Sequence, residues 1–132
     1  MRMLKRIVIR DFVIVEHAAL EFEPGFTVLT GETGAGKSIL VDALSFVLGE
    51  RAEAGMVRLH ARQAEVAAEF ELGMDASALG AWLAQAGLEG DPGTCLVRRT
   101  LEPGGRSRAF VNGHATTVAQ LRELGEMLVD IH

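Results

Sequence analysis

The sequence predicts an α/β fold, and three observations carry this prediction. Several short segments place apolar residues at every second position, which is the period of a β-strand. Other segments repeat apolar residues every three or four positions, as helices do, and a glycine-rich segment joins one strand-like segment to one helix-like segment. With 132 residues, 48% hydrophobic residues and a formal net charge of −5, the chain has the composition of one globular domain or of part of one.

The composition also excludes several classes of protein. The apolar runs are all shorter than the roughly 18 residues that a transmembrane helix needs. The positive charge within residues 1–6 is followed by an apolar run too short for a secretory signal, so we expect a cytoplasmic protein. The single cysteine, Cys95, cannot form an internal disulfide or a cysteine-based zinc cluster, and we expect it to be a small buried residue.

The first 49 residues are expected to form three strands and then a helix. Residues 6–12 have the two-residue period of a strand, with Ile7 and Ile9 on one face and Arg6 and Arg10 on the other. A Pro-Gly turn at residues 24–25 reverses the chain between the next two strands. The helix is apolar on most sides, so it should be buried against a sheet, and Gly49 should end it. The expected strands are residues 6–12, 18–22 and 26–30, and the expected helix is residues 37–48.

The rest of the chain is expected to form a strand, a helix, a β-hairpin, a second helix and a last strand. Asp75 should cap the first of these helices, Gly87 should end it, and Trp82 should anchor it in the core. Thr117, followed three residues later by Gln120, predicts a capping box at the start of the second helix. The expected strands are residues 64–72, 95–101, 107–111 and 127–132, and the expected helices are residues 76–86 and a segment from 117 through 124.

The most informative motif is residues 31–38, which read Gly, four residues, Gly-Lys-Ser between a predicted strand and a predicted helix. This is the pattern of a phosphate-binding loop. Its glycines allow several backbone N–H groups to approach a triphosphate, and the following helix adds unpaired N–H groups and its dipole. We expect Lys37 to contact the β- and γ-phosphates and Ser38 to bind Mg²⁺. The sequence therefore predicts a site for a nucleoside triphosphate with Mg²⁺.

The expected site extends over the whole motif. The residues expected to bind the nucleotide are Gly31, Glu32, Thr33, Gly34, Ala35, Gly36, Lys37, Ser38 and Ile39, with Ser38 as the metal ligand. Glu32 and Thr33 are interpreted as shaping the loop rather than as catalytic groups. Asp42 lies one helical turn after Ser38 and is expected to have a surface or packing role, with support of the metal's water shell as the alternative.

Hydrolysis needs more groups than this motif supplies, namely a second acid for Mg²⁺ and a group that orients water. Asp130, at the end of the last predicted strand, is a weak candidate for that acid, and a structural role is the favoured alternative. We assign no catalytic residue within the chain. Packing or solvent roles are expected for the histidines His17, His60 and His114.

Positive charge is concentrated in two places, although the total charge is acidic. Both places are candidate surfaces for the phosphates of a nucleic acid, and the alternative is that these side chains are merely solvated on half-exposed strands. The candidate contacts are Lys5, Arg6, Arg10, Arg98, Arg99, Arg106 and Arg108.

A combination of segments carries a resemblance to a known family. These segments are residues 7–12, 24–40, 42–44, 48–51, 105–113, 120–125 and 128–132, so they cover nearly the whole chain. Together they resemble the N-terminal part of the RecN family of bacterial DNA-repair ATPases, which are relatives of the structural-maintenance-of-chromosomes (SMC) proteins. The loop alone would indicate only a P-loop NTPase, whereas the combination is specific.

The resemblance implies the N-terminal lobe of an ABC-type ATPase head, with a mixed sheet and an antiparallel β subdomain. Residues 1–132 would be the first half of the head, and a coiled coil and the C-terminal half would lie outside the chain. It also implies ATP and Mg²⁺ as cofactors, DNA and a second head as partners, and a cytoplasmic, nucleoid-associated protein. The engagement cycle of two heads would act in double-strand-break repair, and this segment alone would bind nucleotide weakly and hydrolyse none.

Two alternatives stay open. A nucleotide-kinase type of phosphotransferase uses the same loop, but such enzymes usually place it after their first strand, whereas three strands are predicted before it here. A scaffold whose nucleotide only drives dimerisation is the other alternative, and it would show nucleotide-dependent dimers without phosphate release.

Overall fold

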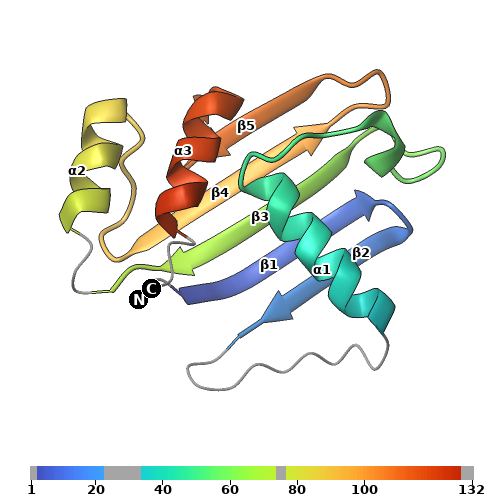
Figure 1. Cartoon of the computed structure of the whole chain (residues 1–132), viewed down its shortest axis with the longest axis horizontal. Helices are drawn as coiled ribbons and strands as arrows, with labels where there is room; N and C mark the ends of the chain where they lie inside the picture. The colour runs from blue at the N-terminus through green and yellow to red at the C-terminus, as the bar shows by residue number, and fades with distance from the viewer. Residues whose placement is uncertain (1–2, 23–33, 74–76, 129–132) are drawn as a thin grey trace.

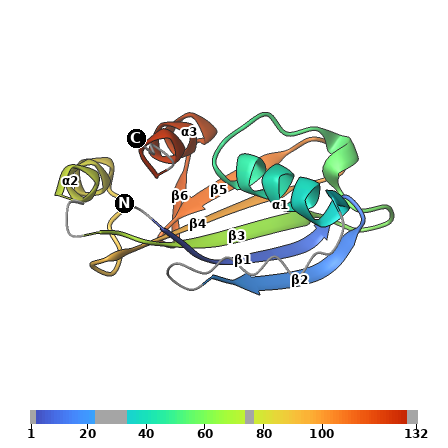
Figure 2. The ribbon, with the colours of Figure 1, turned by 60° about the horizontal axis from the view of Figure 1, so that its bottom comes forward.

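The computed structural model describes residues 3–22, 34–73 and 77–128. These form one six-stranded sheet in which every pair of neighbouring strands is antiparallel, in the order β2-β1-β3-β4-β5-β6. Figures 1 and 2 show α1 and α3 side by side on one face of the sheet, with α2 beside one end. The strand predicted at residues 26–30 lies outside the described residues.

The elements agree with most of the predicted ones. The strands are β1 (Met3–Phe12), β2 (Val15–Glu21), β3 (Ala64–Glu71), β4 (Thr94–Leu101), β5 (Ser107–Val111) and β6 (His114–Thr116). The helices are α1 (Gly34–Val47), α2 (Ser77–Ala86) and α3 (Val118–Leu128), with a short 3₁₀ helix, η1 (Ala54–Met56). Thus α1 begins three residues before the predicted start at Lys37, and β6 was not predicted.

The two faces of the sheet differ in burial. On β3, burial alternates residue by residue, and Val66, Ala68 and Phe70 face the helices. The register places Ile7 of β1 opposite Ala68, so the buried side chains of neighbouring strands form continuous rows. The opposite face bears half-exposed residues such as Ala67, and no described helix covers it (Figure 2). The core of the described part of the chain therefore lies between one sheet face and the helices.

Helix α1 packs on the sheet through side chains spaced three and four residues apart. Leu40, Ala43 and Phe46 are buried, as the apolar pattern predicted. The helix ends in a Schellman motif: the N–H of Glu50 donates to the carbonyl of Ser45 at 3.0 Å, and the N–H of Gly49 donates to that of Phe46 at 3.2 Å. Gly49 has φ of +98°, a conformation that glycine adopts without strain.

The end of α3 corrects one prediction. Residues 127–132 were expected to be a strand, but α3 continues through Leu128, so the first two of these residues are helical and the other four lie outside the described part. The reason is the position of Leu128, which follows Leu121 and Leu124 on one helix face, and all three are buried. A short apolar run is compatible with either structure, and here packing against the sheet selects the helix.

The caps of the helices also differ in part from expectation. At the start of α3, the N–H of Gln120 donates to Thr117 Oγ1 at 3.0 Å, which is one half of the predicted capping box. The Gln120 side chain does not complete it, because its Oε1 accepts a hydrogen bond from Thr116 Oγ1 at 2.6 Å. In α2, Gly87 follows the helix with φ of +73°, as predicted, while Trp82 is only half-buried against the core.

Candidate functional site

The candidate nucleotide site is the N-terminal end of α1. The helix begins at Gly34, inside the glycine-rich motif, so Lys37 and Ser38 belong to its first turns. No acidic residue lies in the first turn, and Ser38 is exposed. A helix start of this kind presents unpaired N–H groups and a positive dipole end, which suits an anion. The loop residues 31–33 and the Lys37 side chain lie outside the described part of the structure.

Two further residues of this region can be placed. Ile39, expected to line the nucleotide site, is half-buried against the core. Asp42 is exposed on α1, which fits the expected surface role and leaves the alternative role near the metal untested. The residues present therefore fit a phosphate group with Mg²⁺: the first turn of the helix bears no acidic residue, and Ser38 offers an exposed hydroxyl there.

The C-terminal end of α1 is held by Arg99 of β4. Only 3% of Arg99 is exposed, and its Nη1 donates to the carbonyls of Phe46, at 2.8 Å, and Glu50. Its Nε donates to Ser107 Oγ at 2.9 Å, and its guanidinium stacks on the Phe46 ring, 4.6 Å from the centroid. Burial lowers the pKa of Arg99 below its usual value.

This corrects the prediction that Arg99 contacts DNA. Its side chain points to the helix-covered face and is used inside the molecule, so it offers nothing to a phosphate outside. The sequence contained a signal for this placement, because Arg99 shares the two-residue alternation of Cys95, Val97 and Leu101, which are all buried.

The other basic candidates are on the surface. Lys5, Arg10, Arg106 and Arg108 are exposed. Arg6 pairs with Glu21 at 4.0 Å, and Arg98 pairs with Glu65 at 3.8 Å while its guanidinium lies 4.1 Å from the centroid of the Phe110 ring. By strand register, Arg10, Arg98 and Arg108 lie on the face that no described helix covers. The structure therefore brings part of the two sequence clusters onto one face.

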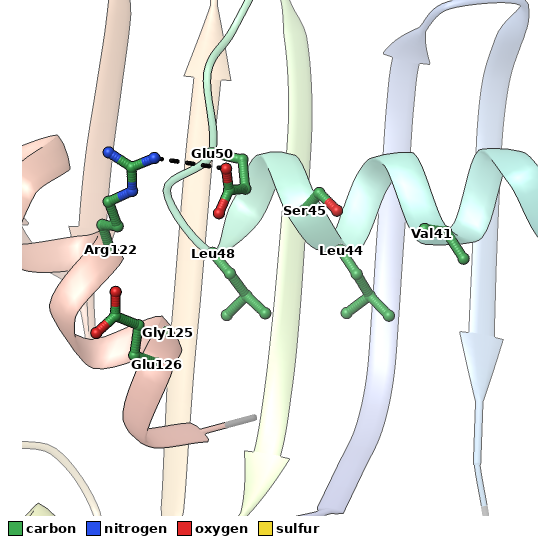
Figure 3. Close-up of a pocket in the computed structure, with 8 residues that line it drawn as sticks. All are labelled: Val41, Leu44, Ser45, Leu48, Glu50, Arg122, Gly125 and Glu126. Carbon is green, nitrogen blue, oxygen red and sulfur yellow. Dashed lines mark ion pairs between the residues drawn. The ribbon is translucent and has the colours of Figure 1, made fainter. Parts of the chain in front are cut away.

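A pocket of about 280 Å³ lies between α1 and α3 (Figure 3). It is lined by Val41, Leu44, Ser45, Leu48, Glu50, Arg122, Gly125 and Glu126. Figure 3 shows the apolar side chains of α1 along one wall, and Arg122 paired with Glu50 at 3.6 Å near its end. Val41 is 59% exposed, although the helix is apolar there. The described part of the chain thus leaves an apolar side of α1 open.

The remaining candidates have ordinary surroundings. His17, His60 and His114 are exposed, and Nε2 of His114 lies 2.9 Å from the Glu89 carbonyl. Cys95 is buried, as predicted, and burial raises the pKa of its thiol to about 12. Asp130 lies outside the described residues. None of the described helices has the length and apolar character that crossing a membrane requires.

Comparison with known proteins adds to this geometry. Residues 3–130 match the family described as RecF/RecN/SMC N terminal domain. The chain is 44% identical over 130 residues to the DNA repair protein RecN of Xylella fastidiosa (strain Temecula1), and 45% identical over 131 residues to that of Vibrio cholerae. The RecN of Bacillus subtilis is 42% identical over 130 residues. Each alignment covers 98% of this chain but only 22% or 23% of the relative, so the chain spans less than a quarter of these proteins.

Solved structures with similar folds include SMC proteins and the recombination mediator protein RecF. One comes from a study of ATP-driven dimerization and DNA-stimulated activation of SMC ATPases; its TM-score is 0.72 at 24% identity, over 98% of this chain and 81% of that one. The SMC head domain of Thermotoga maritima gives a TM-score of 0.60 at 20% identity, over 92% and 41%. At these identities the likeness concerns the fold, which agrees with the expected ABC-type head.

Proposed function

The chain belongs to the RecF/RecN/SMC N-terminal domain family, and from this premise we propose that it is the ATP-binding first half of a RecN-like ATPase head. The observation that carries the proposal is the motif at residues 31–38 running directly into α1. In this head, residues 31–39 hold the triphosphate, with Lys37 on the β- and γ-phosphates and Ser38 on Mg²⁺. The bound Mg²⁺ would neutralise charge that develops on the phosphates.

We propose that hydrolysis requires a complementary C-terminal half-head and a second head. No residue of this chain is assigned as the catalytic base, and the apolar side of α1 with Val41 and Leu44 is open in the described residues. That side fits a further lobe, because exposed apolar surface of this kind marks an interface. The second head would close over ATP from the other side, so head engagement would depend on the nucleotide.

We propose DNA as the macromolecular partner, in the repair of double-strand breaks. The support is the RecN relatives, which are DNA repair proteins, together with the exposed cations near the β4–β5 hairpin. Lys5, Arg6, Arg10, Arg98, Arg106 and Arg108 are the candidate contacts that burial leaves available. Arg6 and Arg98 already pair with acids, so the other four side chains should contribute more to phosphate binding.

Calorimetry with Mg·ATP tests the nucleotide site. The chain contains two lysines, Lys5 and Lys37, so the same substitution at each gives a matched pair. Lys37→Ala should abolish binding by the folded chain combined with the complementary half-head, whereas Lys5→Ala should leave the affinity unchanged, because Lys5 is an exposed residue of β1. Equal affinities of Lys37→Ala and the unmodified chain would reject the site.

The alternatives lead to different measurements. A phosphotransferase would transfer phosphate to a small acceptor without a second head, and family membership favours the ATPase instead. A scaffold would dimerise with ATP but release no phosphate. Phosphate release by the completed head, lost in Lys37→Ala together with dimerisation, distinguishes the proposed ATPase from both.

A further inference from the structure

The helix-facing row of β4 contains an arginine among apolar residues. Cys95, Val97 and Leu101 of that row are fully buried, and Arg99 between them is 3% exposed. Burying a guanidinium removes it from water, and apolar residues of similar size often replace buried charges without loss of stability. What an arginine adds at this position is a set of directed hydrogen bonds that an apolar side chain cannot make.

Those hydrogen bonds converge on the end of α1. The Phe46 carbonyl, in the last turn, and the Glu50 carbonyl, just beyond it, both accept from Arg99 Nη1. A helix leaves its last carbonyls without partners inside the helix, so a cation at this end also complements its dipole. Ser107 of β5 accepts from Nε, and the Phe46 ring contacts both the guanidinium and the Phe12 ring, whose centroid is 5.5 Å from its own. One side chain thus ties the end of α1 to two strands.

We propose that Arg99 is a positioning residue for the nucleotide-phosphate site at the other end of α1. By fixing the last turn of α1 on the sheet, it fixes where the first turn, with Lys37 and Ser38, stands. The inference rests on the proposed binding of ATP at that first turn.

The length of the helix supports this role. Fourteen residues span about 20 Å, so a pivot of about 10° at the C-terminal end would move the N-terminal turn by about 3.5 Å. Phosphate contacts tolerate displacements of roughly 0.5 to 1 Å. At that distance the charge of Arg99 is itself screened, since the Debye length is about 8 Å at physiological ionic strength. The effect on phosphate binding therefore passes through the position of the helix.

The experiment compares three variants of the chain, each combined with the complementary half-head. Arg99→Met removes every hydrogen bond, Arg99→Lys keeps the charge with a single ammonium, and Val97→Ala is a control in the same buried row that should lower stability without touching the end of α1. Urea unfolding establishes conditions in which all are folded. The first measurement is the Kd for Mg·ATP, obtained from the anisotropy of a fluorescent ATP analogue. The second is the distance between two spin labels, one at Asp42 on α1 and one at Ala19 on β2, which are both exposed residues. The labels are placed in a Cys95→Ala background, which removes the only native cysteine.

In Arg99→Met, we expect the Kd to rise by at least about tenfold and the distance distribution to broaden, because the last turn of α1 loses its hydrogen bonds to the sheet and can pivot more. Arg99→Lys should give intermediate values of the Kd and of the width of the distance distribution. If Arg99→Met does not fold, these two measurements on Arg99→Lys still test the proposal. Val97→Ala should match the unmodified chain in both readouts. A narrow, unshifted distance distribution in the Arg99 variants would overturn the proposal, and so would an equal loss of affinity in Val97→Ala. If the unmodified chain combined with the complementary half-head bound no Mg·ATP, the nucleotide site would fail, and the spin-label distance would still decide whether Arg99 positions α1.

Discussion

Gly125 of α3 lies directly against the main-chain oxygen of Leu48, at the end of α1. A Cβ at Gly125 would stand 2.6 Å from that oxygen, and a Cβ at Gly49 would stand 2.7 Å from Cα of Arg122. The two glycines therefore let the backbones of α1 and α3 approach more closely than any other residue would allow. The end of α1 is thus held by Arg99 from the sheet and by α3 from the side, which makes it a fixed point of the fold.

Gly125→Ala should lower the free energy of unfolding by about 1–3 kcal/mol, because the added methyl group overpacks against backbone that cannot move aside. Urea denaturation measures this change. Gly80→Ala is the matched control: Gly80 lies in α2, and a Cβ added there would have no neighbouring atom within 4 Å, so alanine should stabilise by about 0.5–1 kcal/mol. Equal effects at both positions would contradict the close packing.

Asn112 has a positive φ in a turn and makes two side-chain hydrogen bonds. Substitutions separate the contributions of these two features to stability. Asn112 has φ of +51°, accepts from the Leu96 N–H at 3.0 Å and donates to the Leu88 carbonyl at 2.8 Å. Asn112→Ala should cost about 2–3 kcal/mol, since it loses both bonds and tolerates positive φ poorly. Asn112→Gly should cost about 1 kcal/mol less than alanine, because glycine accepts that φ. Thermal unfolding of the two variants shows which one is more stable. A more stable alanine variant would contradict this prediction.

The buried thiol of Cys95 makes stability depend on alkaline pH. Burial raises its pKa to about 12 from the usual 9.0, so between these values the unfolded chain has released the proton and the folded chain still holds it. Stability from this group is complete below pH 9 and falls above it, by up to about 1.4 kcal/mol per pH unit. Urea titrations from about pH 8 to about pH 10.5 measure the slope, which should be smaller in Cys95→Ala. At about pH 8, a thiol-reactive dye should also label the folded chain much more slowly than the unfolded chain, because burial covers the thiol and keeps it protonated.

The open side of α1 gives a prediction about assembly. Val41→Asp should change the stability of the chain by less than about 0.5 kcal/mol, because Val41 is 59% exposed. The same change should weaken binding of a complementary half-head by at least about tenfold, since it buries a charge in an apolar contact. Leu59→Asp is the control. Leu59 is 77% exposed and lies outside α1, so this substitution should leave the binding of the half-head unaffected. Calorimetry of the two halves decides between these outcomes.

The proposed DNA contact is tested by two charge reversals of equal size. Arg106→Glu with Arg108→Glu changes the tip of the β4–β5 hairpin, and Arg51→Glu with Arg62→Glu changes the net charge equally at exposed residues elsewhere. Only the hairpin pair should weaken binding of a labelled DNA duplex and reduce the dependence of affinity on salt, by about 0.9 in the logarithmic slope for each lost phosphate contact. Equal losses in both variants would indicate a general effect of charge and remove the hairpin from the proposal.

Local periodicity was enough to predict most elements and their buried faces. The alternation in residues 64–72 predicted β3 and the side on which Val66, Ala68 and Phe70 are buried, and Gly49 and Gly87 marked two helix ends correctly. The β5–β6 turn was missed, although Asn112-Gly113, with φ of +51° and +83°, is a recognisable two-residue hairpin signal. Because these features depend on residues close together in the chain, they can be predicted from the sequence.

By itself the sequence determined most elements of the fold and the nucleotide motif, because local spacing encodes both, and the resemblance of several segments indicated the family. Only the tertiary structure decided that residues 127–128 are helical and that Arg99 turns inward to α1 instead of outward to a partner. The physical reason is that an apolar run or an arginine is compatible with several environments. The partners that select among them, the sheet beneath α3 and the carbonyls at the end of α1, come from segments far away in the chain.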